Sequence, residues 1–200
     1  MEPGDERVGP DTDVAGDGER GSTDDLGELR DARFSADRRY RYWLQRRWDP
    51  SRPQFAYVLL NPSRADADRD DPTVRKLSVL TSANGGGGFE LVNLFAVMDT
   101  RQVGLHLPDA VEAAPGENDR WIERVVERAD VVVLGWGDGM ADDLLTQGRR
   151  AAVRRRAQQV WPLVRNRQPR CFRTIGSGAP GHPGRLRSTA PIVRYHGTDA

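Results

Sequence analysis

The sequence predicts an α/β fold, a three-layer α/β/α sandwich around a mainly parallel four-stranded sheet. Apolar runs rich in β-branched and aromatic residues are typical of strands buried on both faces of a sheet. Helix-length segments separate these runs, as parallel strands require. Each run then ends in a short group of polar or glycine residues. The predicted core strands cover residues 55–60, 89–92, 131–134 and 171–175.

The segment before the first core strand also has strand character. Residues 39–44 alternate loosely and are rich in aromatic side chains, which favours a lead-in strand. Residues 49–53 contain two prolines and an aspartate and are expected to turn the chain into the core. After that core strand, Pro72 suits the first turn of a helix over residues 72–82, with Asp71 as its cap.

Two further helices are expected between the later strands. Residues 116–129 place apolar side chains at helical spacing, at Trp121, Ile122, Val125 and Val126. Residues 142–165 form the next helical segment, which breaks or ends near Pro162. Its apolar stripe is expected to be buried and its arginines to face the solvent.

Composition divides the chain into a tail and one domain. Residues 1–37 hold twelve acidic side chains against four basic ones and few large apolar residues, which predicts a disordered acidic tail. Residues 38–200 are expected to form a single α/β domain. No signal peptide or membrane-spanning run is present in the sequence, so a cytoplasmic protein without a membrane partner is expected. The single cysteine, Cys171, excludes an internal disulfide framework.

The net charge of zero hides a strong segregation of charge. Residues 144–198 contain twelve arginines and no acidic residue. Arg154, Arg155 and Arg156 would lie on the wet face of the last helix, where they would hold the phosphates of a nucleic acid. The alternative is an ordinary solvated helix face in an arginine-rich protein. Charge by itself leaves both interpretations open.

The predicted strand ends carry the candidate site. In open α/β sheets, ligands bind outside the carboxyl ends of the strands. Asn61, Pro62 and Ser63 follow the first core strand, and Asn93 follows the second. An amide offers a donor and an acceptor, which suits recognition of a nucleobase edge. Both segments are equally compatible with simple turns.

The later strand ends add an aromatic residue and a histidine. Trp136 and Gly137 would bring backbone and an aromatic face close to a ligand, or simply cover the sheet. His182 lies in a glycine-rich loop and would act as an acid, a base or a donor. Asp66 belongs to an acidic loop over residues 65–71. No calcium-loop or zinc spacing is present, so neither a metal nor another cofactor is expected.

Several motifs together resemble the bacterial and phage domain of unknown function 1643. The resemblance covers about residues 38–190 and supplies no settled activity. The motifs that carry it are Arg41-Tyr42…Trp48, Leu60-Asn61-Pro62-Ser63-Arg64-Ala65-Asp66, Asp71-Pro72-Thr73-Val74-Arg75, Val92-Asn93-Leu94-Phe95, Trp136-Gly137 and His182-Pro183. The chain departs from the family pattern at Arg64 and at residues 177–181.

The order of strand-end motifs also resembles the uracil-DNA glycosylase superfamily, more remotely. That resemblance implies that Asn61 orients the attacking water, Asn93 reads the base edge and His182 stabilises the leaving base. Pro62, Ser63, Asp66, Trp136 and Gly137 would then contact the substrate. The residues after His182-Pro183 do not match the DNA-intercalating loop, and asparagine stands where the best-known branch has a catalytic aspartate.

The leading hypothesis is therefore a protein that acts on nucleic acid or nucleotides, with hydrolysis of a base N-glycosidic bond as its sharpest form. One alternative is a non-catalytic module that binds a nucleotide or a single strand in the same pocket. Another is a metal-dependent small-molecule phosphohydrolase that uses the acidic loop. The sequence leaves all of them open.

Overall fold

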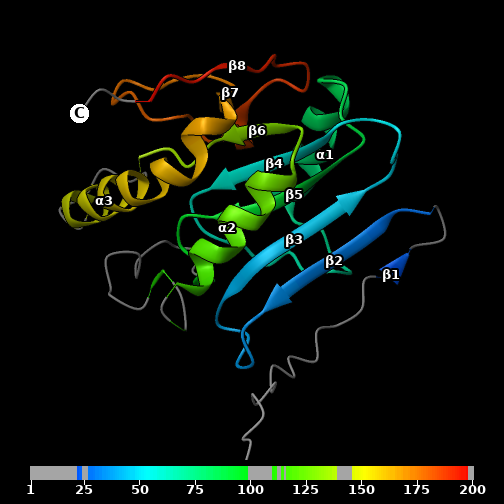
Figure 1. Cartoon of the computed structure of the whole chain (residues 1–200), viewed down its shortest axis with the longest axis horizontal. Coiled ribbons are helices and arrows are strands. Elements are labelled where there is room, and N and C mark those ends of the chain that lie inside the picture. Colours follow the sequence, from blue (N-terminus) through cyan, green and yellow to red (C-terminus); the bar gives the residue numbers. More distant parts are fainter. Residues whose placement is uncertain are drawn as a thin grey trace, which may run out of the picture.

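The predicted core strands form the centre of the sheet. A computed structural model describes residues 22–23, 27–98, 110–111, 114, 116–138 and 146–197. Strands β5 (Gly88–Asn93), β4 (Gln54–Leu59), β6 (Val131–Leu134) and β7 (Arg170–Cys171) lie next to one another in that order and pair in parallel. The α/β class and the parallel centre of the sheet are confirmed (Figure 1).

The complete sheet is wider and mixed, so the prediction of four strands is wrong. In the described residues it has eight strands in the order β1-β2-β3-β5-β4-β6-β7-β8. The additional strands are β1 (Ser22–Thr23), β2 (Leu29–Phe34), β3 (Arg41–Arg47) and β8 (Val193–Arg194), all paired antiparallel to a neighbour. The lead-in strand is thus confirmed as β3, shifted by two residues. The others lack the apolar runs by which buried strands are recognised.

Strand β2 shows that the folded domain starts earlier than expected. Residues 29–34 pair along β3 and bury Ala32 and Asp31, although they fall in the segment expected to be disordered. The expected boundary at residue 37 is therefore too late. The reason is that β2 is polar and contributes alternate small or charged residues to the sheet, a pattern that composition does not distinguish from a tail. Residues 1–21 lie outside the described part of the chain.

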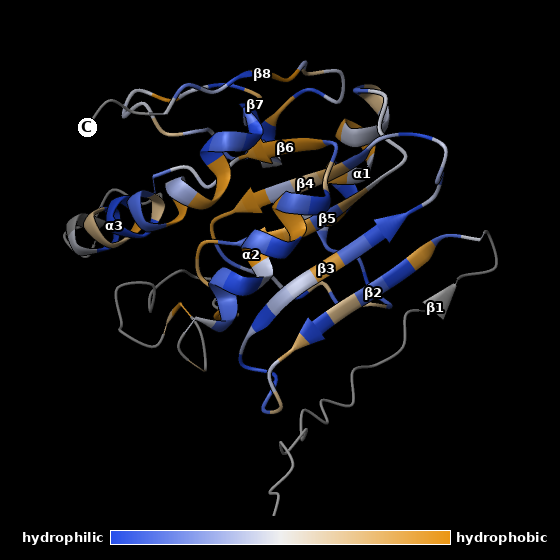
Figure 2. Ribbon diagram, viewed as in Figure 1, coloured by the Kyte–Doolittle hydropathy of each residue, from blue (hydrophilic) through white to orange (hydrophobic). Residues whose placement is uncertain are grey.

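The helices cover both faces of the sheet. Helix α1 (Pro72–Ala83) packs on Phe55, Tyr57 and Leu59 of β4. Helices α2 (Glu117–Arg128) and α3 (Thr146–Val164) pack on the opposite face, against Ala56 and Val58. In Figure 2 strand β6 is hydrophobic, which agrees with its place between these layers. Strand β3 is mostly hydrophilic although most of its residues are buried. Short 3-10 helices follow at η2 (Arg165–Arg167) and η3 (Pro183–Arg185).

The expected helix boundaries are close to those observed. Asp71 caps α1, since its Oδ1 accepts from the Val74 amide at 2.8 Å. Residues 142–145, the expected start of the third helix, lie outside the described residues. Pro162 lies inside α3, which continues to Val164. The predicted strand over residues 171–175 ends at Cys171, because Thr174 forms a bridge with Pro180 instead of extending the sheet. Within the described residues, no helix is long and apolar enough to cross a membrane.

Candidate functional site

Loops from three parallel strands meet at the carboxyl edge of the sheet. The Leu94 amide donates to the carbonyl of Leu59 at 2.9 Å, and the Gly135 amide donates to Val58 at 3.0 Å. These bonds tie the loops after β5 and β6 to the end of β4. The loops that carry the predicted site therefore leave the sheet side by side, as expected for parallel strands.

The Asn61 segment forms a compact turn at this edge. Asn61 is half-buried and its Nδ2 donates to the carbonyl oxygen of Pro62 at 3.2 Å. Pro62 is buried and Ser63 is half-buried. An asparagine amide does not accept a proton at neutral pH, so Asn61 is able to orient a water molecule but not to deprotonate it.

Asn93 presents a buried acceptor at the end of β5. The residue is 2% exposed, and its Oδ1 has no hydrogen-bond partner among the described residues. Asn118 of α2 fixes the backbone here, because its Nδ2 donates to the carbonyls of Asn93 and Leu94 at 3.0 and 3.1 Å. A buried polar atom without a partner costs about 1–3 kcal/mol. Such atoms are uncommon in native proteins, and a ligand or an ordered water is one explanation for them.

The Trp-Gly and His-Pro segments contact each other. The Gly137 amide donates to the carbonyl of Pro180 at 2.8 Å. Gly137 has a φ of +70°, which favours glycine. A side chain at Gly135 would approach Leu59 Cδ2 to 2.9 Å and Pro183 Cδ to 3.1 Å, so that position requires glycine for close approach. The structure therefore brings Trp136, Gly137 and the loop of His182 together.

His182 is exposed on this loop and is poised as a neutral donor. Its Nδ1 accepts from the Gly184 amide at 3.1 Å, which leaves the proton of the neutral ring on Nε2. Loss of hydration lowers the pKa of His182, and the carboxylate of Asp71 partly opposes this shift.

The acidic loop is held by arginines from the neighbouring strands. Asp70 accepts from Arg46 and from Arg30, each at 2.7 Å. Asp66 is half-buried, and its Oδ1 accepts from the backbone amides of Asp68 and Arg69. Asp66 therefore closes the turn of the loop, and Asp70 neutralises two arginines. Among the described residues, no group of three or more histidine, cysteine or acidic side chains is arranged to hold a metal ion.

Arg41 is buried at this edge of the sheet. No role was predicted for this residue from the sequence. The pairing of β2 with β3 shifts by one residue at this point, so Arg33 faces Trp43 while Phe34 faces Arg41. A bulge of this kind redirects a side chain. Arg41 donates to the carbonyl of Ala65 at 2.8 Å, and burial lowers its pKa to about 10 although Asp71 and Asp66 oppose the shift. The Arg41 Nε and the Asp71 Oδ2 both lack partners among the described residues.

A large cavity opens beside Trp136, between α3 and the C-terminal loops. Its volume is about 1450 Å³, and we call it the α3 cavity. Exposed arginines of α3 form one wall, at positions Arg150, Arg154 and Arg155. The opposite side is the glycine-rich loop around Gly176 and Gly178. The hydroxyl of Tyr195 donates to the carbonyl of Gly178 at 3.2 Å and so fixes this loop.

Aromatic residues form the inner end of the α3 cavity. Tyr195 packs edge-on against Trp136 and Trp161, with ring centroids 6.4 and 5.9 Å apart. Trp136 and Gly137 line the cavity and also belong to the carboxyl edge of the sheet, so they connect the two regions. Asn61, Asn93 and His182 are not among the residues that line the cavity. The strand-end amides and the arginine wall are thus neighbouring parts rather than one pocket.

Arg156 differs from its neighbours on α3 and cannot contribute to this wall. It is 5% exposed, its Nε donates to the carbonyl of Leu94 at 2.8 Å, and its NH2 group is bonded to Asp119 of α2. Its role is to hold α3 and α2 to the loop after β5. The expectation that Arg156 contacts a nucleic-acid backbone is therefore corrected by its burial.

The family model described as "Protein of unknown function (DUF1643)" matches residues 41–184. The chain belongs to this family. The matched segment of this DUF1643 protein begins at Arg41 and ends just beyond His182 and Pro183, so it contains every strand-end residue described above. No curated protein and no solved structure matches the chain.

Proposed function

We propose that this DUF1643 protein acts on nucleic acid or nucleotides, with the sugar-phosphate part held in the α3 cavity. The observation that carries the proposal is the arginine wall of that cavity, formed by Arg150, Arg154 and Arg155. Each guanidinium presents several donors in a plane, a geometry that suits phosphate oxygens. The facing glycine-rich loop lets a ligand approach the backbone closely.

The sharper form of the proposal is hydrolysis of a base N-glycosidic bond at the strand ends. Cleavage builds negative charge on the departing base, and the Nε2–H of neutral His182 is a suitable donor to it. The unpartnered Oδ1 of Asn93 would accept from a base N–H, and Asn61 would orient the water. This form retains the remote resemblance to the uracil-DNA glycosylase superfamily, including a similar fold, as an interpretation.

A non-catalytic binding module is the second candidate, and one observation favours it. Asn61 cannot serve as a base, and its Nδ2 is occupied by the Pro62 carbonyl. The same cavity would then bind a nucleotide or a single strand without turnover. The metal-dependent phosphohydrolase has no comparable support, because Arg30 and Arg46 neutralise Asp70.

Base release from oligonucleotides that carry uracil or other altered bases distinguishes the two candidates. We expect release by the native chain, and its loss in Asn61→Ala and in His182→Ala. Asn166→Ala and His196→Ala are matched controls, because both residues are exposed and neither lines the cavity. Absence of release by the native chain, with binding retained, would overturn the glycosidase form in favour of the binding module.

A further inference from the structure

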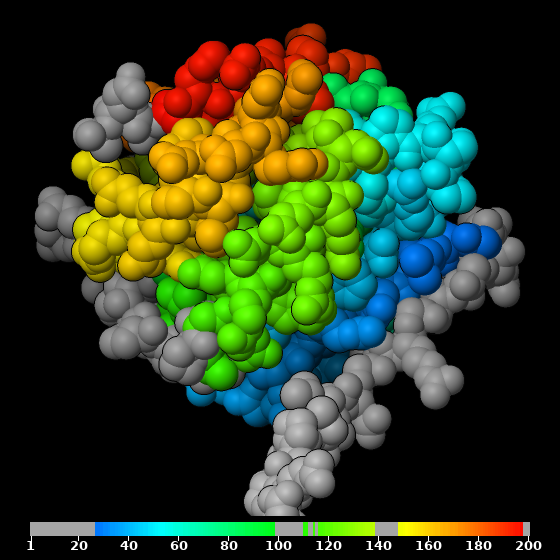
Figure 3. Space-filling view, in the orientation of Figure 1, coloured from blue at the N-terminus to red at the C-terminus, as the bar shows by residue number. Residues whose placement is uncertain are grey.

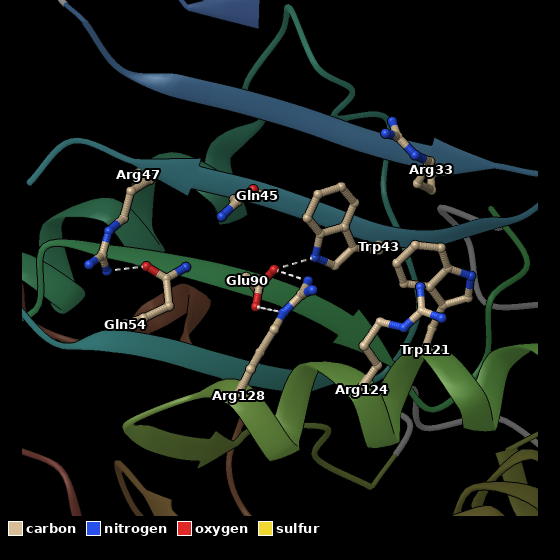
Figure 4. A pocket seen from close by; sticks show the side chains of 9 residues that line it. All are labelled: Arg33, Trp43, Gln45, Arg47, Gln54, Glu90, Trp121, Arg124 and Arg128. Atoms are coloured by element: carbon tan, nitrogen blue, oxygen red, sulfur yellow. Dashed lines mark hydrogen bonds and ion pairs between the residues drawn. The ribbon is translucent and has the colours of Figure 1, made fainter. Parts of the chain in front are cut away.

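A second cleft lies on the same face as α2, away from the carboxyl ends of the strands. Its volume is about 570 Å³, and we call it the α2 cleft (Figure 4). Strands β2 to β5 form its floor and α2 forms one side. The lining residues are Arg33, Trp43, Gln45, Arg47, Gln54, Glu90, Trp121, Arg124 and Arg128. None of these residues belongs to the site described above.

The cleft exists because α2 covers only part of this face of the sheet. In Figure 1 no helix lies over β2 and β3 on the viewed face, and in Figure 3 their blue atoms reach the surface beside the green atoms of α2. Trp43, Gln45 and Arg47 alternate along β3 and all line the cleft, so this side of β3 is mainly polar. A polar strip beside the core requires partners for its buried groups.

The one carboxylate of the cleft is already satisfied. Glu90 is 2% exposed and lies on the central strand β5. Its Oε1 accepts from Trp43 Nε1 at 2.8 Å, its Oε2 accepts from Arg128 Nε at 2.7 Å, and the Arg128 NH2 group also bonds Oε1. Glu90 therefore neutralises Arg128 and holds α2 on the sheet. It offers little acceptor capacity to a ligand.

Gln54 presents unused donors to the cleft. Its Oε1 accepts from Arg47, and because arginine is only a donor, this bond fixes which end of the amide faces Arg47. The Nε2 is consequently turned toward the middle of the cleft, as Figure 4 shows, and it is buried without a hydrogen-bond partner among the described residues. Arg47 is itself anchored to the carbonyls of Pro50 and Arg52, each at 3.0 Å.

The remaining polar groups around the cleft are mostly cationic donors. Arg124 is exposed, with its guanidinium 5.1 Å from the Trp121 ring centroid. Arg33 and Arg128 each lie 5.7 Å from the Trp43 ring centroid. The Trp43 and Trp121 rings stack on each other at 5.6 Å, so they form a rigid apolar wall that positions the arginines. Arg33 is paired with Asp31 at 2.6 Å, as Arg128 is with Glu90. The donors of the cleft that are left for a ligand therefore include Gln54 Nε2 and the guanidinium of Arg124.

We propose that the α2 cleft is a binding site for a phosphate-bearing ligand of about the size of a nucleotide. A phosphate ester supplies both an acceptor oxygen for Gln54 Nε2 and negative charge for Arg124, which line the same cleft. The volume falls within the range of small-molecule pockets. Gln54 begins β4, so this site is at the opposite end of the strand from Asn61 and does not depend on the function proposed above.

Calorimetric titration of the full chain with adenosine monophosphate, adenosine and inorganic phosphate tests the proposal. We expect adenosine monophosphate to bind and adenosine not to bind. Gln54→Glu replaces the free amide by a carboxylate that repels phosphate but still pairs with Arg47, so its Tm should not fall while affinity drops about tenfold or more. Arg124→Ala should also weaken binding. Arg120→Ala, an exposed position of α2 outside the cleft, is the matched control.

The phosphate could belong to a free phosphate ester or to the end of a nucleic-acid strand, and a short oligonucleotide with a terminal phosphate distinguishes the two. Binding of the mononucleotide that both cleft variants weaken identifies a free phosphate ester. Binding of the oligonucleotide only, again weakened by both variants, places the terminal phosphate of a strand in the cleft. Failure of every phosphate compound to bind, or binding that is unchanged in Gln54→Glu and Arg124→Ala, would overturn the proposal.

Discussion

Gly135 lies in the loop after β6, where there is no room for a side chain. A Cβ atom there would lie 2.9 Å from Leu59 Cδ2 and 3.1 Å from Pro183 Cδ. We expect Gly135→Ala to lower the free energy of unfolding by about 1–3 kcal/mol, because Leu59 of β4 and Pro183 must both shift to admit the methyl group. Urea denaturation measures the change. Gly176→Ala, which has open space at the Cβ position, should be nearly neutral, and equal effects in both variants would contradict the close contact.

His182 should give stability a dependence on pH. Its folded pKa is lowered by loss of hydration, so the unfolded chain binds more protons between the folded value and the ordinary value. The free energy of unfolding therefore rises with pH in that window. The contribution of His182 is fully present above about pH 6.5 and is lost as the pH drops through the folded pKa. Denaturation measured from about pH 5 to 7 should show a shallower slope in His182→Gln. An unchanged slope would show that the ring is not desolvated.

Individual residues show how far sequence reasoning reaches. The pattern of buried runs places Trp136 and Gly137 directly after β6, because it shows where that parallel strand ends. It does not place His182, since β7 ends at Cys171 and the chain then turns back before it reaches the histidine. Placing Arg154, Arg155 and Arg156 on one exposed face is wrong for Arg156, and helical spacing alone gives the reason. Successive helical residues are about 100° apart, so three in a row cannot all face the solvent on a packed helix. The burial of Arg41 at this edge was not predicted, because it follows from a bulge that no sequence periodicity reveals.

At the scale of an element, buried arginines hold the acidic loop in place. The Arg46 side chain is fully buried and meets Asp70 at 2.7 Å and the carbonyl of Asp66 at 2.6 Å. We expect Arg46→Ala to cost about 3–5 kcal/mol, the typical result of breaking a buried pair. Added Mg²⁺ or Ca²⁺ should leave the Tm of the native chain unchanged. A clear rise in Tm with either cation would contradict the assignment of these carboxylates to arginines.

The elements also show which sequence signals are sufficient. Helix α1 is predicted accurately because a cap, a proline in the first turn and the apolar spacing all agree. Strand β7 is shorter than predicted because the apolar run continues into a loop that bends back toward Pro180. Strand β2 has no apolar run, and it is held by its antiparallel pairing with β3 and by long-range contacts such as Arg30 with Asp70 of the acidic loop. Such contacts leave no local signature.

At the scale of the whole molecule, the N-terminal segment contributes to the sheet. Deletion of residues 1–37 removes β2 and exposes the edge of β3, so we expect a lower Tm and a greater tendency to aggregate. Deletion of residues 1–21 keeps β2 and is the matched control. Thermal unfolding of both truncated chains measures the contribution of the strand. An equal Tm in the two chains would show that β2 adds nothing to stability.

Positive charge is concentrated in one part of the molecule, since residues 144–198 contain twelve arginines and no acidic residue. The most direct test of the proposed function is the salt dependence of binding to a single strand of about 10 nucleotides. Replacement of Arg150, Arg154 and Arg155 by alanine should weaken binding and reduce the slope of log K against log salt by about 0.7 for each lost phosphate contact. Replacement of the exposed Arg165, Arg187 and Arg194, which lie outside the α3 cavity, should have a smaller effect. Equal effects of the two triple variants would contradict the assignment of this cavity to nucleic acid.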